Sequence, residues 1–104
     1  MKKCINKLVR DNIPSICEQN GQTPETRILD GESYTAALKE KLLEEVREYL
    51  ADNSIEELAD ILEVVEALAE DRGASLDAVM EVKARKQAKN GAFRDKIFLI
   101  STEG

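Results

Sequence analysis

Hydrophobic residues recur at helical spacing along much of the chain, in stretches that end at residues unfavourable to helices. Asp30 is a good N-cap for a long helix that runs to about Ala51. Asp52-Asn53 breaks this helix, and Ser54 with Glu57 three residues later forms a capping box for the next one. Because about three residues join them, the two helices are expected to run antiparallel and adjacent.

Two further helices are predicted on either side of this pair. The second helix of the pair stops at Gly73, and Ser75 caps a third long helix that reaches about Asn90, with a glycine just past its end. Near the N-terminus, Pro14 suits the first turn of a short helix that ends near Gly21. The pattern therefore predicts a chain built mainly from helices.

Two short segments favour strands instead. Residues 26–29 (Thr-Arg-Ile-Leu) and residues 96–101 (Lys-Ile-Phe-Leu-Ile-Ser) are rich in residues that suit strands, and they are compatible with a two-stranded pairing. The predicted fold class is thus mainly all-α, a helical bundle with a short β element. No linker or low-complexity stretch divides the sequence, so residues 1–104 are expected to form a single domain.

Helical geometry directs acidic side chains toward the interface of the paired helices. Glu45 falls inside the apolar arc of the first helix, with Glu48 at its margin and Glu44 pointing away. Glu57 lies at one edge of the second helix's arc, and Asp60 is just beyond it. The apolar arc of the first helix contains Tyr34, Leu38, Leu42, Val46, Tyr49 and Leu50. The arc of the second contains Leu58, Ile61, Leu62, Val65, Leu68 and Ala69.

The break between the helices sets the register of these carboxylates. With Asn53 as the midpoint, Glu48 lies five residues before it and Glu57 four residues after. Glu45 lies eight residues before the midpoint and Asp60 seven residues after. At a rise of about 1.5 Å per residue, each carboxylate faces its counterpart at nearly the same height. Four carboxylates are therefore predicted to converge between two helices.

Clustered and partly buried carboxylates repel one another unless a cation neutralises them. Mg²⁺ suits such a site because it binds a few carboxylates, keeps some waters and takes substrate phosphates as its remaining ligands. The alternative is a solvated acidic surface, which is common on helices. The capping box already accounts for Glu57. The inward helical phase and the matched register favour the metal site.

The third long helix changes character along its length. Its first half continues an apolar stripe, and its second half places Lys83 and Gln87 on that stripe, with Lys86 alongside. If the helix folds back from Gly73-Ala74, Lys86 reaches about the height of Asp60. Such cations could hold phosphates beyond a metal ion. Alternatively, basic residues near a helix C-terminus complement the helix dipole.

Composition narrows the classes of function. The chain has 104 residues, a net charge of −6 and no histidine, which argues against binding nucleic-acid polymers. Two cysteines, Cys4 and Cys17, fit no metal spacing and suit a reducing compartment. No apolar run approaches the roughly 20 residues of a membrane span, and the N-terminus lacks the apolar segment of a signal peptide. We therefore expect a cytoplasmic protein that does not bind membranes.

The acidic residues also resemble a known motif. Glu45-x-x-Glu48, followed closely by Glu57-x-x-Asp60 on the next helix, resembles the ExxE…ExxD signature of the all-α nucleoside triphosphate pyrophosphohydrolase superfamily. That superfamily includes MazG-like proteins, dimeric dUTPases and phosphoribosyl-ATP pyrophosphohydrolases.

Both ends of the sequence extend the resemblance. Residues 6–14 (Asn-Lys-Leu-Val-Arg-Asp-Asn-Ile-Pro) look like the N-terminal hallmark of a small single-domain branch, described as phosphoribosyl-ATP pyrophosphohydrolase-like. Arg85-Lys86 and residues 90–93 (Asn-Gly-Ala-Phe) are similar to the end of that branch, where Gly-Gly-Phe is more usual. Ala92 stands where that branch usually has a glycine, and this difference affects the geometry of the loop and not the metal site.

The resemblance implies Mg²⁺-dependent hydrolysis of the α–β phosphoanhydride, with a nucleoside monophosphate and pyrophosphate as products. We expect that Mn²⁺ can replace Mg²⁺ in the site. A role in nucleotide-pool house-cleaning would fit this activity. The metal ligands and catalytic residues carried over are Glu45, Glu48, Glu57 and Asp60. The residues expected to bind substrate phosphates are Lys83, Lys86, Arg85, Lys7 and Arg10. For Lys7 and Arg10, a structural salt bridge to Asp11 is an equally good interpretation.

Alternatives stay open at this point. The substrate of the enzyme would be phosphoribosyl-ATP if the chain served histidine biosynthesis. A protein of another class, a helical module that binds nucleotides or partners without turnover, would also fit. Members of the superfamily are usually dimers or tetramers whose helices combine across subunits. We expect a homodimer or tetramer here, with Val64, Val65 or Leu68 at the subunit interface.

Overall fold

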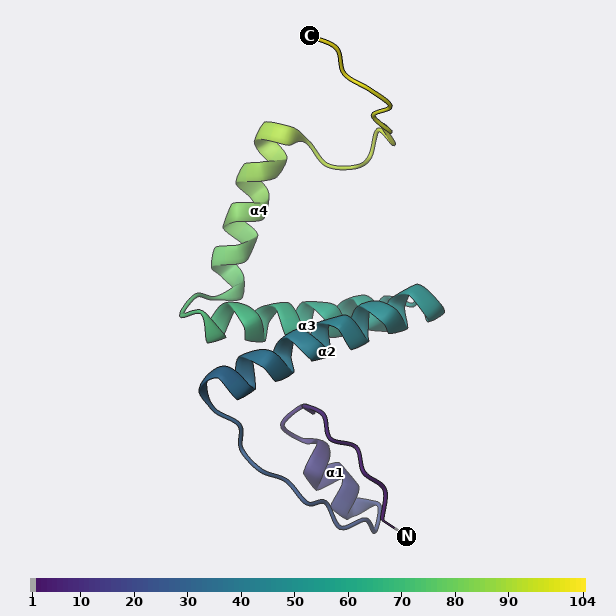
Figure 1. Cartoon of the computed structure of the whole chain (residues 1–104), viewed down its shortest axis with the longest axis vertical. Helices are drawn as coiled ribbons and strands as arrows, with labels where there is room; N and C mark the ends of the chain where they lie inside the picture. The colour runs from purple at the N-terminus through teal and green to yellow at the C-terminus, as the bar shows by residue number, and fades with distance from the viewer. Residues whose placement is uncertain (1) are drawn as a thin grey trace.

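Four helices make up the regular structure of residues 2–104, the part of the chain that the computed structural model describes (Figure 1). In chain order they are α1 (Ile13–Gln19), α2 (Gly31–Asp52), α3 (Ile55–Asp71) and α4 (Leu76–Asn90). Each helix lies where the hydrophobic pattern places it. The predicted fold class is confirmed: the protein is all-α.

Side-chain caps fix where the helices begin. Ser54 Oγ accepts a hydrogen bond from the Glu57 backbone N–H at 3.3 Å. Ser75 Oγ accepts one from the Ala78 backbone N–H at 3.2 Å. These bonds satisfy backbone donors that have no partner inside the first turn of a helix. The predicted starts of α3 and α4 are therefore confirmed.

The turns after α2 and α3 use residues that tolerate left-handed backbone. Asn53 has a φ of 57° and donates its N–H to the Tyr49 carbonyl at 2.7 Å. Gly73 has a φ of 78° and donates to the Glu70 carbonyl, while Ala74 donates to the Ala69 carbonyl. This pair of bonds is the Schellman motif, which ends a helix and redirects the chain.

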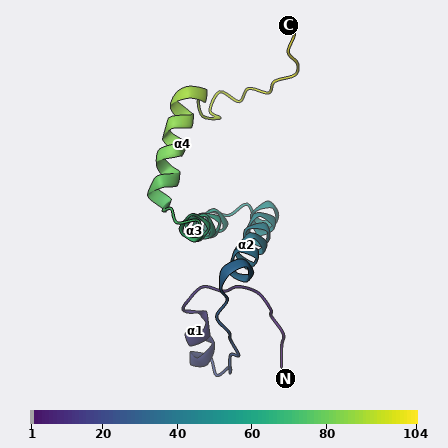
Figure 2. The same ribbon diagram turned by 60° about the vertical axis from the view of Figure 1, so that its left-hand side comes forward.

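Helices α2 and α3 form an antiparallel hairpin (Figures 1 and 2). Among the described residues, the buried apolar side chains are Leu38 on α2 and Val64 and Ala69 on α3, and Leu38 is only 2% exposed. Glu45 is buried with them and is 6% exposed. The predicted antiparallel pairing and the inward direction of Glu45 are both confirmed.

A second apolar row on each hairpin helix is left uncovered within the chain. On α2 this row is Leu43, Val46 and Leu50, and on α3 it is Ile55, Leu58 and Leu62. Both rows follow the spacing i, i+3, i+7, which places three side chains on one face of a helix. The predicted apolar arcs are therefore wider than the face that the two helices share. Val64, expected at a subunit interface, is buried within the single chain.

Helix α4 leaves the hairpin instead of folding back along it (Figures 1 and 2). It contacts α3, and residues 81–90 are all exposed. The prediction that α4 brings Lys86 to the height of Asp60 is wrong within one chain. The physical reason is that the second half of α4 is polar and has no apolar stripe to bury against α2 or α3.

The two-stranded β element is absent from the described residues: 26–29 and 96–101 carry no strand. They lie toward opposite ends of the molecule, below and above the hairpin in Figure 1. An isolated two-stranded ribbon is marginal in water without further cover. The C-terminal segment is exposed instead, with Phe93 at 99%.

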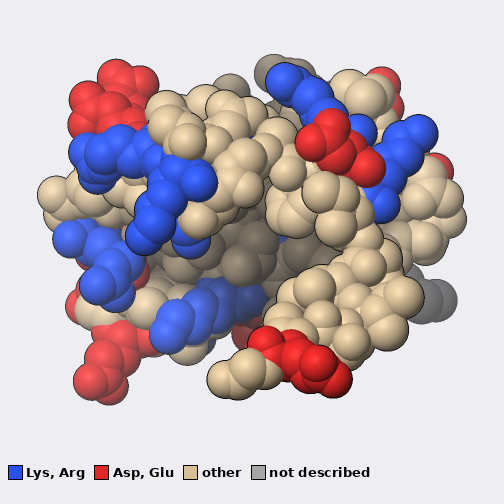
Figure 3. Space-filling view, turned by 90° about the horizontal axis from the view of Figure 1, so that it is seen from above, with Lys and Arg blue, Asp and Glu red and all other residues tan. Residues whose placement is uncertain are grey.

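The molecule is elongated, with extents of 63 × 32 × 24 Å. Viewed from the end that carries α4, basic and acidic side chains are interspersed and do not form one basic patch (Figure 3). No helix in residues 2–104 has the length and apolar character needed to cross a membrane.

Candidate functional site

The α2–α3 hairpin brings the four predicted carboxylates together. Carboxylate oxygens of Glu45, Glu57 and Asp60 all lie within 4.8 Å of one another. A second group with the same spacing joins Glu45 to Glu44 and Glu48 on α2. Glu45 belongs to both groups, so the carboxylates form one continuous acidic cluster. We define the acidic cluster as Glu44, Glu45, Glu48, Glu57 and Asp60.

The cluster contains buried oxygens without hydrogen-bond partners. Glu45 Oε1 lies 3.4 Å from Lys41 Nζ, but Glu45 Oε2 is buried and lacks a partner in the described part of the chain. Glu57 Oε2 is buried and unpaired in the same way. Buried polar atoms nearly always have partners, because leaving one without a partner costs free energy. These two oxygens are therefore available to accept a hydrogen bond from water or to bind a cation.

Two carboxyl groups of the cluster have raised pKa values. Burial, followed by the side-chain hydrogen bond with Glu48, raises the pKa of Glu57 to about 7. Burial and then the Glu48 charge raise the pKa of Glu45, while Lys41 opposes the rise. Both shifts show that the cluster disfavours further negative charge. A cation among these oxygens would relieve that penalty.

Two cations contact the cluster from the segment that precedes α1 (residues 2–12, the N-terminal segment). Lys7 Nζ is 2.8 Å from Glu44 Oε1, and Arg10 Nη2 is 2.7 Å from Asp60 Oδ1. Arg10 Nη1 also lies 3.7 Å from Glu63 Oε1. In the described residues neither cation pairs with Asp11. The alternative interpretation, a local salt bridge to Asp11, is therefore wrong.

Glu44 is the residue that the sequence interpretation missed. Helical phase predicts an ordinary surface residue that points away from the hairpin interface. Glu44 is instead half-buried, and it accepts hydrogen bonds from Lys7 of the N-terminal segment and, at 3.4 Å, from Lys41. The hydrogen bond from Lys7 lowers the pKa of Glu44, and the same bond raises the pKa of Lys7. Helical phase alone could not reveal this position, because its partner comes from a distant segment of the chain.

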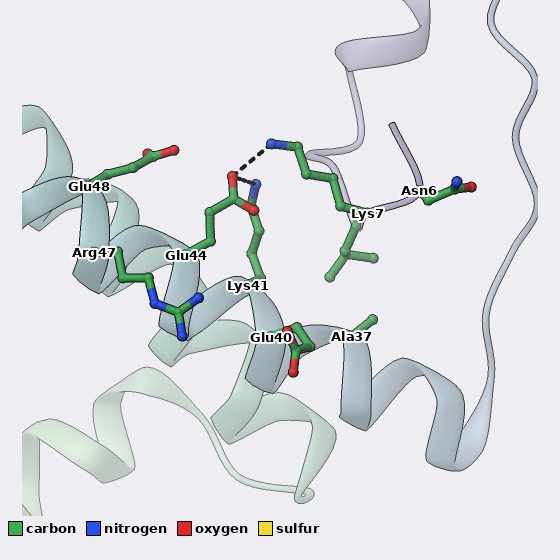
Figure 4. A pocket seen from close by; sticks show the side chains of 9 residues that line it. Asn6, Lys7, Ala37, Glu40, Lys41, Glu44, Arg47 and Glu48 are labelled. Carbon is green, nitrogen blue, oxygen red and sulfur yellow. Dashed lines mark hydrogen bonds and ion pairs between the residues drawn. The ribbon is translucent and has the colours of Figure 1, made fainter. Parts of the chain in front are cut away.

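A cleft of about 450 Å³ adjoins the cluster on the side of the N-terminal segment (Figure 4). Lys7 from that segment and Lys41 from α2 converge on Glu44, and Glu48 lies at the edge of the same space. The cleft is lined by Asn6, Lys7, Leu8, Ala37, Glu40, Lys41, Glu44, Arg47 and Glu48. It therefore offers both cations and carboxylates next to the cluster.

The structure does not bring the predicted cations of α4 to this place. Lys83, Arg85 and Lys86 are exposed on a helix that extends away from the hairpin (Figure 1). Of the five side chains expected to bind phosphates, only Lys7 and Arg10 contact the cluster within one chain.

The donors of the cluster suit a hard divalent cation. Every atom that the cluster offers is a carboxylate oxygen, which is the ligand type that Mg²⁺ and Mn²⁺ prefer. Glu45 Oε2 and Glu57 Oε2 have no hydrogen-bond partner in the described residues and could bind such an ion. The residues present therefore fit a magnesium or manganese ion.

The fold and the cluster define an all-α protein with an acidic centre between two antiparallel helices. A stretch of 45 residues is 49% identical to an uncharacterised protein of Mycolicibacterium smegmatis (strain ATCC 700084 / mc(2)155). This match covers 43% of the chain and 46% of that protein's own length. No protein-family model matches the chain, and no solved structure matches it.

Proposed function

We propose that the protein is a Mg²⁺-dependent nucleoside triphosphate pyrophosphohydrolase, acting on the α–β phosphoanhydride. The observation that carries this proposal is the convergence of Glu45, Glu57 and Asp60 within 4.8 Å, with two of their buried oxygens unpaired among the described residues. The resemblance of these residues to the ExxE…ExxD signature supports the same reaction.

The hairpin supplies the ligands for the metal ion. Glu45 and Glu48 extend from α2, and Glu57 and Asp60 extend from α3. Because the two helices pack directly against each other, the hairpin holds carboxylates from both helices close together. When bound, Mg²⁺ neutralises phosphate charge and activates the attacking water.

The reaction needs few other groups from the protein. A water oxygen forms a bond to phosphorus, the bridging P–O bond of the anhydride breaks, and a proton of the water passes to a base. The products are a nucleoside monophosphate and pyrophosphate. One carboxylate of the cluster can orient the water and accept its proton.

The cleft beside the cluster is the proposed place for the substrate. Lys7 and Lys41 lie where the cleft adjoins Glu44, and cations there would offset the charge of a triphosphate. The lining of the cleft mixes charged, polar and apolar side chains and does not select one nucleobase. An experiment with different substrates therefore distinguishes nucleotide-pool house-cleaning from a step of histidine biosynthesis.

A pyrophosphate-release screen tests the proposal. Purified protein is incubated with Mg²⁺ and each of the common and damaged nucleoside triphosphates, with phosphoribosyl-ATP included. We expect release from at least one substrate, and none when EDTA replaces Mg²⁺. Activity on phosphoribosyl-ATP alone would assign the biosynthetic reaction. No release from any compound would favour a module that binds without turnover.

Variants of the cluster complete the test. Glu48→Gln and Asp60→Asn each remove a proposed ligand charge, so turnover should fall by about a hundredfold or more while the fold is retained. Glu70→Gln, an exposed change on α3 outside the cluster, is the matched control and should keep its activity. Near-full activity of Glu48→Gln or Asp60→Asn would contradict the ligand assignment.

A further inference from the structure

The contact between Arg10 and Asp60 joins a long, adaptable side chain to a proposed metal ligand. The guanidinium nitrogen lies 2.7 Å from Asp60 Oδ1, and both side chains are partly exposed. Exposed ion pairs add little stability, so such a contact exchanges readily for another. Arginine also recognises phosphate oxygens through paired hydrogen bonds. The same group can therefore pair with a carboxylate or with a phosphate.

Arg10 and a divalent cation compete for the same carboxylate. Asp60 has an oxygen within 4.8 Å of oxygens of Glu45 and Glu57, and it also accepts the guanidinium hydrogen bond. An ion bound by Asp60 would carry positive charge next to Arg10, and like charges at this distance repel. Binding of the ion would therefore drive the guanidinium away from Asp60.

The surrounding charges limit where the guanidinium can go. Lys7 Nζ is already paired with Glu44, on the side of the cluster next to the cleft. Glu63 Oε1 lies 3.7 Å from Arg10 Nη1 and belongs to the same helix as Asp60. A triphosphate held at the cluster would offer Arg10 more negative charge than Glu63 does. Arg10 would then be a second phosphate contact from the N-terminal segment, in addition to Lys7.

We infer that Arg10 is a positioning residue that exchanges Asp60 for a phosphate of the substrate. The inference rests on the proposed function, since it takes Asp60 as a metal ligand. It predicts opposite effects of removing the guanidinium. The protein alone should bind a divalent cation more tightly, because its competitor for Asp60 is gone. The protein with its cation should bind a triphosphate group less tightly, because a phosphate contact is gone.

The experiment measures binding of Mn²⁺ and of inorganic tripolyphosphate by the full chain, using calorimetry and the electron paramagnetic resonance of Mn²⁺. The variants are Arg10→Gln and Arg10→Lys. Arg72→Gln, at the far end of α3, makes the same charge change about 18 Å from Asp60 along the helix. Circular dichroism first establishes that each variant is folded.

We expect Arg10→Gln to bind Mn²⁺ about two- to fivefold more tightly than the unmodified chain. It should bind tripolyphosphate in the presence of Mn²⁺ about tenfold more weakly. Arg10→Lys should restore the affinity for Mn²⁺ and only part of that for tripolyphosphate, because an ammonium lacks the paired geometry. Arg72→Gln should leave both affinities unchanged.

Two results would overturn the inference in distinguishable ways. If the unmodified chain binds Mn²⁺ and Arg10→Gln binds it equally or less tightly, Arg10 is a structural ion pair and the metal centre stands. If neither protein binds Mn²⁺, the inference and the proposed function both fail. If Arg72→Gln gains as much affinity for Mn²⁺ as Arg10→Gln does, the gain comes from the change in net charge alone. That result would overturn the role of Arg10.

Discussion

Glu57 takes part in two features at the start of α3, the helix cap and the acidic cluster. Its backbone N–H is bound by Ser54 Oγ, which caps the helix and leaves the Glu57 carboxyl group to enter the acidic cluster. Burial and the hydrogen bond with Glu48 then raise the pKa of Glu57 to about 7. The cap and the cluster are therefore compatible uses of one residue, although the sequence presents them as competing explanations.

This raised pKa predicts how stability depends on pH when EDTA removes divalent cations. The ordinary value is 4.5, so between that pH and about 7 the folded chain holds a proton on Glu57 that the unfolded chain has lost. The contribution is fully present below pH 4.5 and is lost as pH rises through 7. The melting temperature should therefore fall between about pH 5 and pH 8.

Glu57→Gln supplies the control for this pH dependence. The neutral amide cannot titrate, so the fall in melting temperature should become shallower, with the raised pKa of Glu45 accounting for the remainder. The lowered pKa of Glu44 acts below pH 4.5 and lies outside this window. A melting temperature that rises with pH over the same range, in both proteins, would contradict the account.

At the scale of the elements, the start and end of each helix depend on neighbouring residues. Ser54, Ser75 and Gly73 act through hydrogen bonds to residues a few positions away, so the sequence predicts them well. The approach of Lys7 and Arg10 to the hairpin depends on residues 37 and 50 positions distant. No local pattern encodes such contacts, which is why helical phase does not reveal the contact between Glu44 and Lys7. The direction of α4 is likewise a matter of packing between elements, so the position of Lys86 could not be predicted from its own helix.

The hairpin itself should depend on its few buried apolar side chains. Leu38 is 2% exposed between α2 and α3, so Leu38→Ala should lower the free energy of unfolding by about 2–5 kcal/mol. Ile28→Ala removes a similar side chain from a loop where it is 95% exposed, and it should change stability little. Urea unfolding monitored by circular dichroism measures both. Equal losses in the two variants would mean that the hairpin is not the stabilising unit.

At the scale of the whole molecule, one chain leaves much apolar surface uncovered. In residues 2–104 only Leu38, Val64 and Ala69 are buried apolar residues, and Leu50 of the α2 row is 70% exposed. A core this small gives one chain little apolar burial to offset the conformational entropy of ordering it. The uncovered rows on α2 and α3 have the spacing that helices use to pack in bundles. We propose that a second copy covers them in a homodimer, or in a tetramer built from such dimers.

Leu62→Lys tests this assembly. A charge in the α3 row should prevent a second copy from packing there, so the protein should become monomeric and lose activity and thermal stability together. Gln22→Lys adds the same charge on an exposed loop and should keep the assembly. Light scattering coupled to gel filtration at micromolar concentration gives the mass. A stable, active monomer of the unmodified chain would contradict the proposed dimer.

Anomalous diffraction from crystals grown with Mn²⁺ tests whether the carboxylates between α2 and α3 hold a divalent cation. We expect an anomalous peak between the two helices, about 2.0–2.3 Å from carboxylate oxygens of Glu45, Glu57 or Asp60. The peak should be absent from crystals of Asp60→Asn grown under the same conditions. Crystals of the unmodified chain with well-defined carboxylates and no anomalous peak among them would contradict the account.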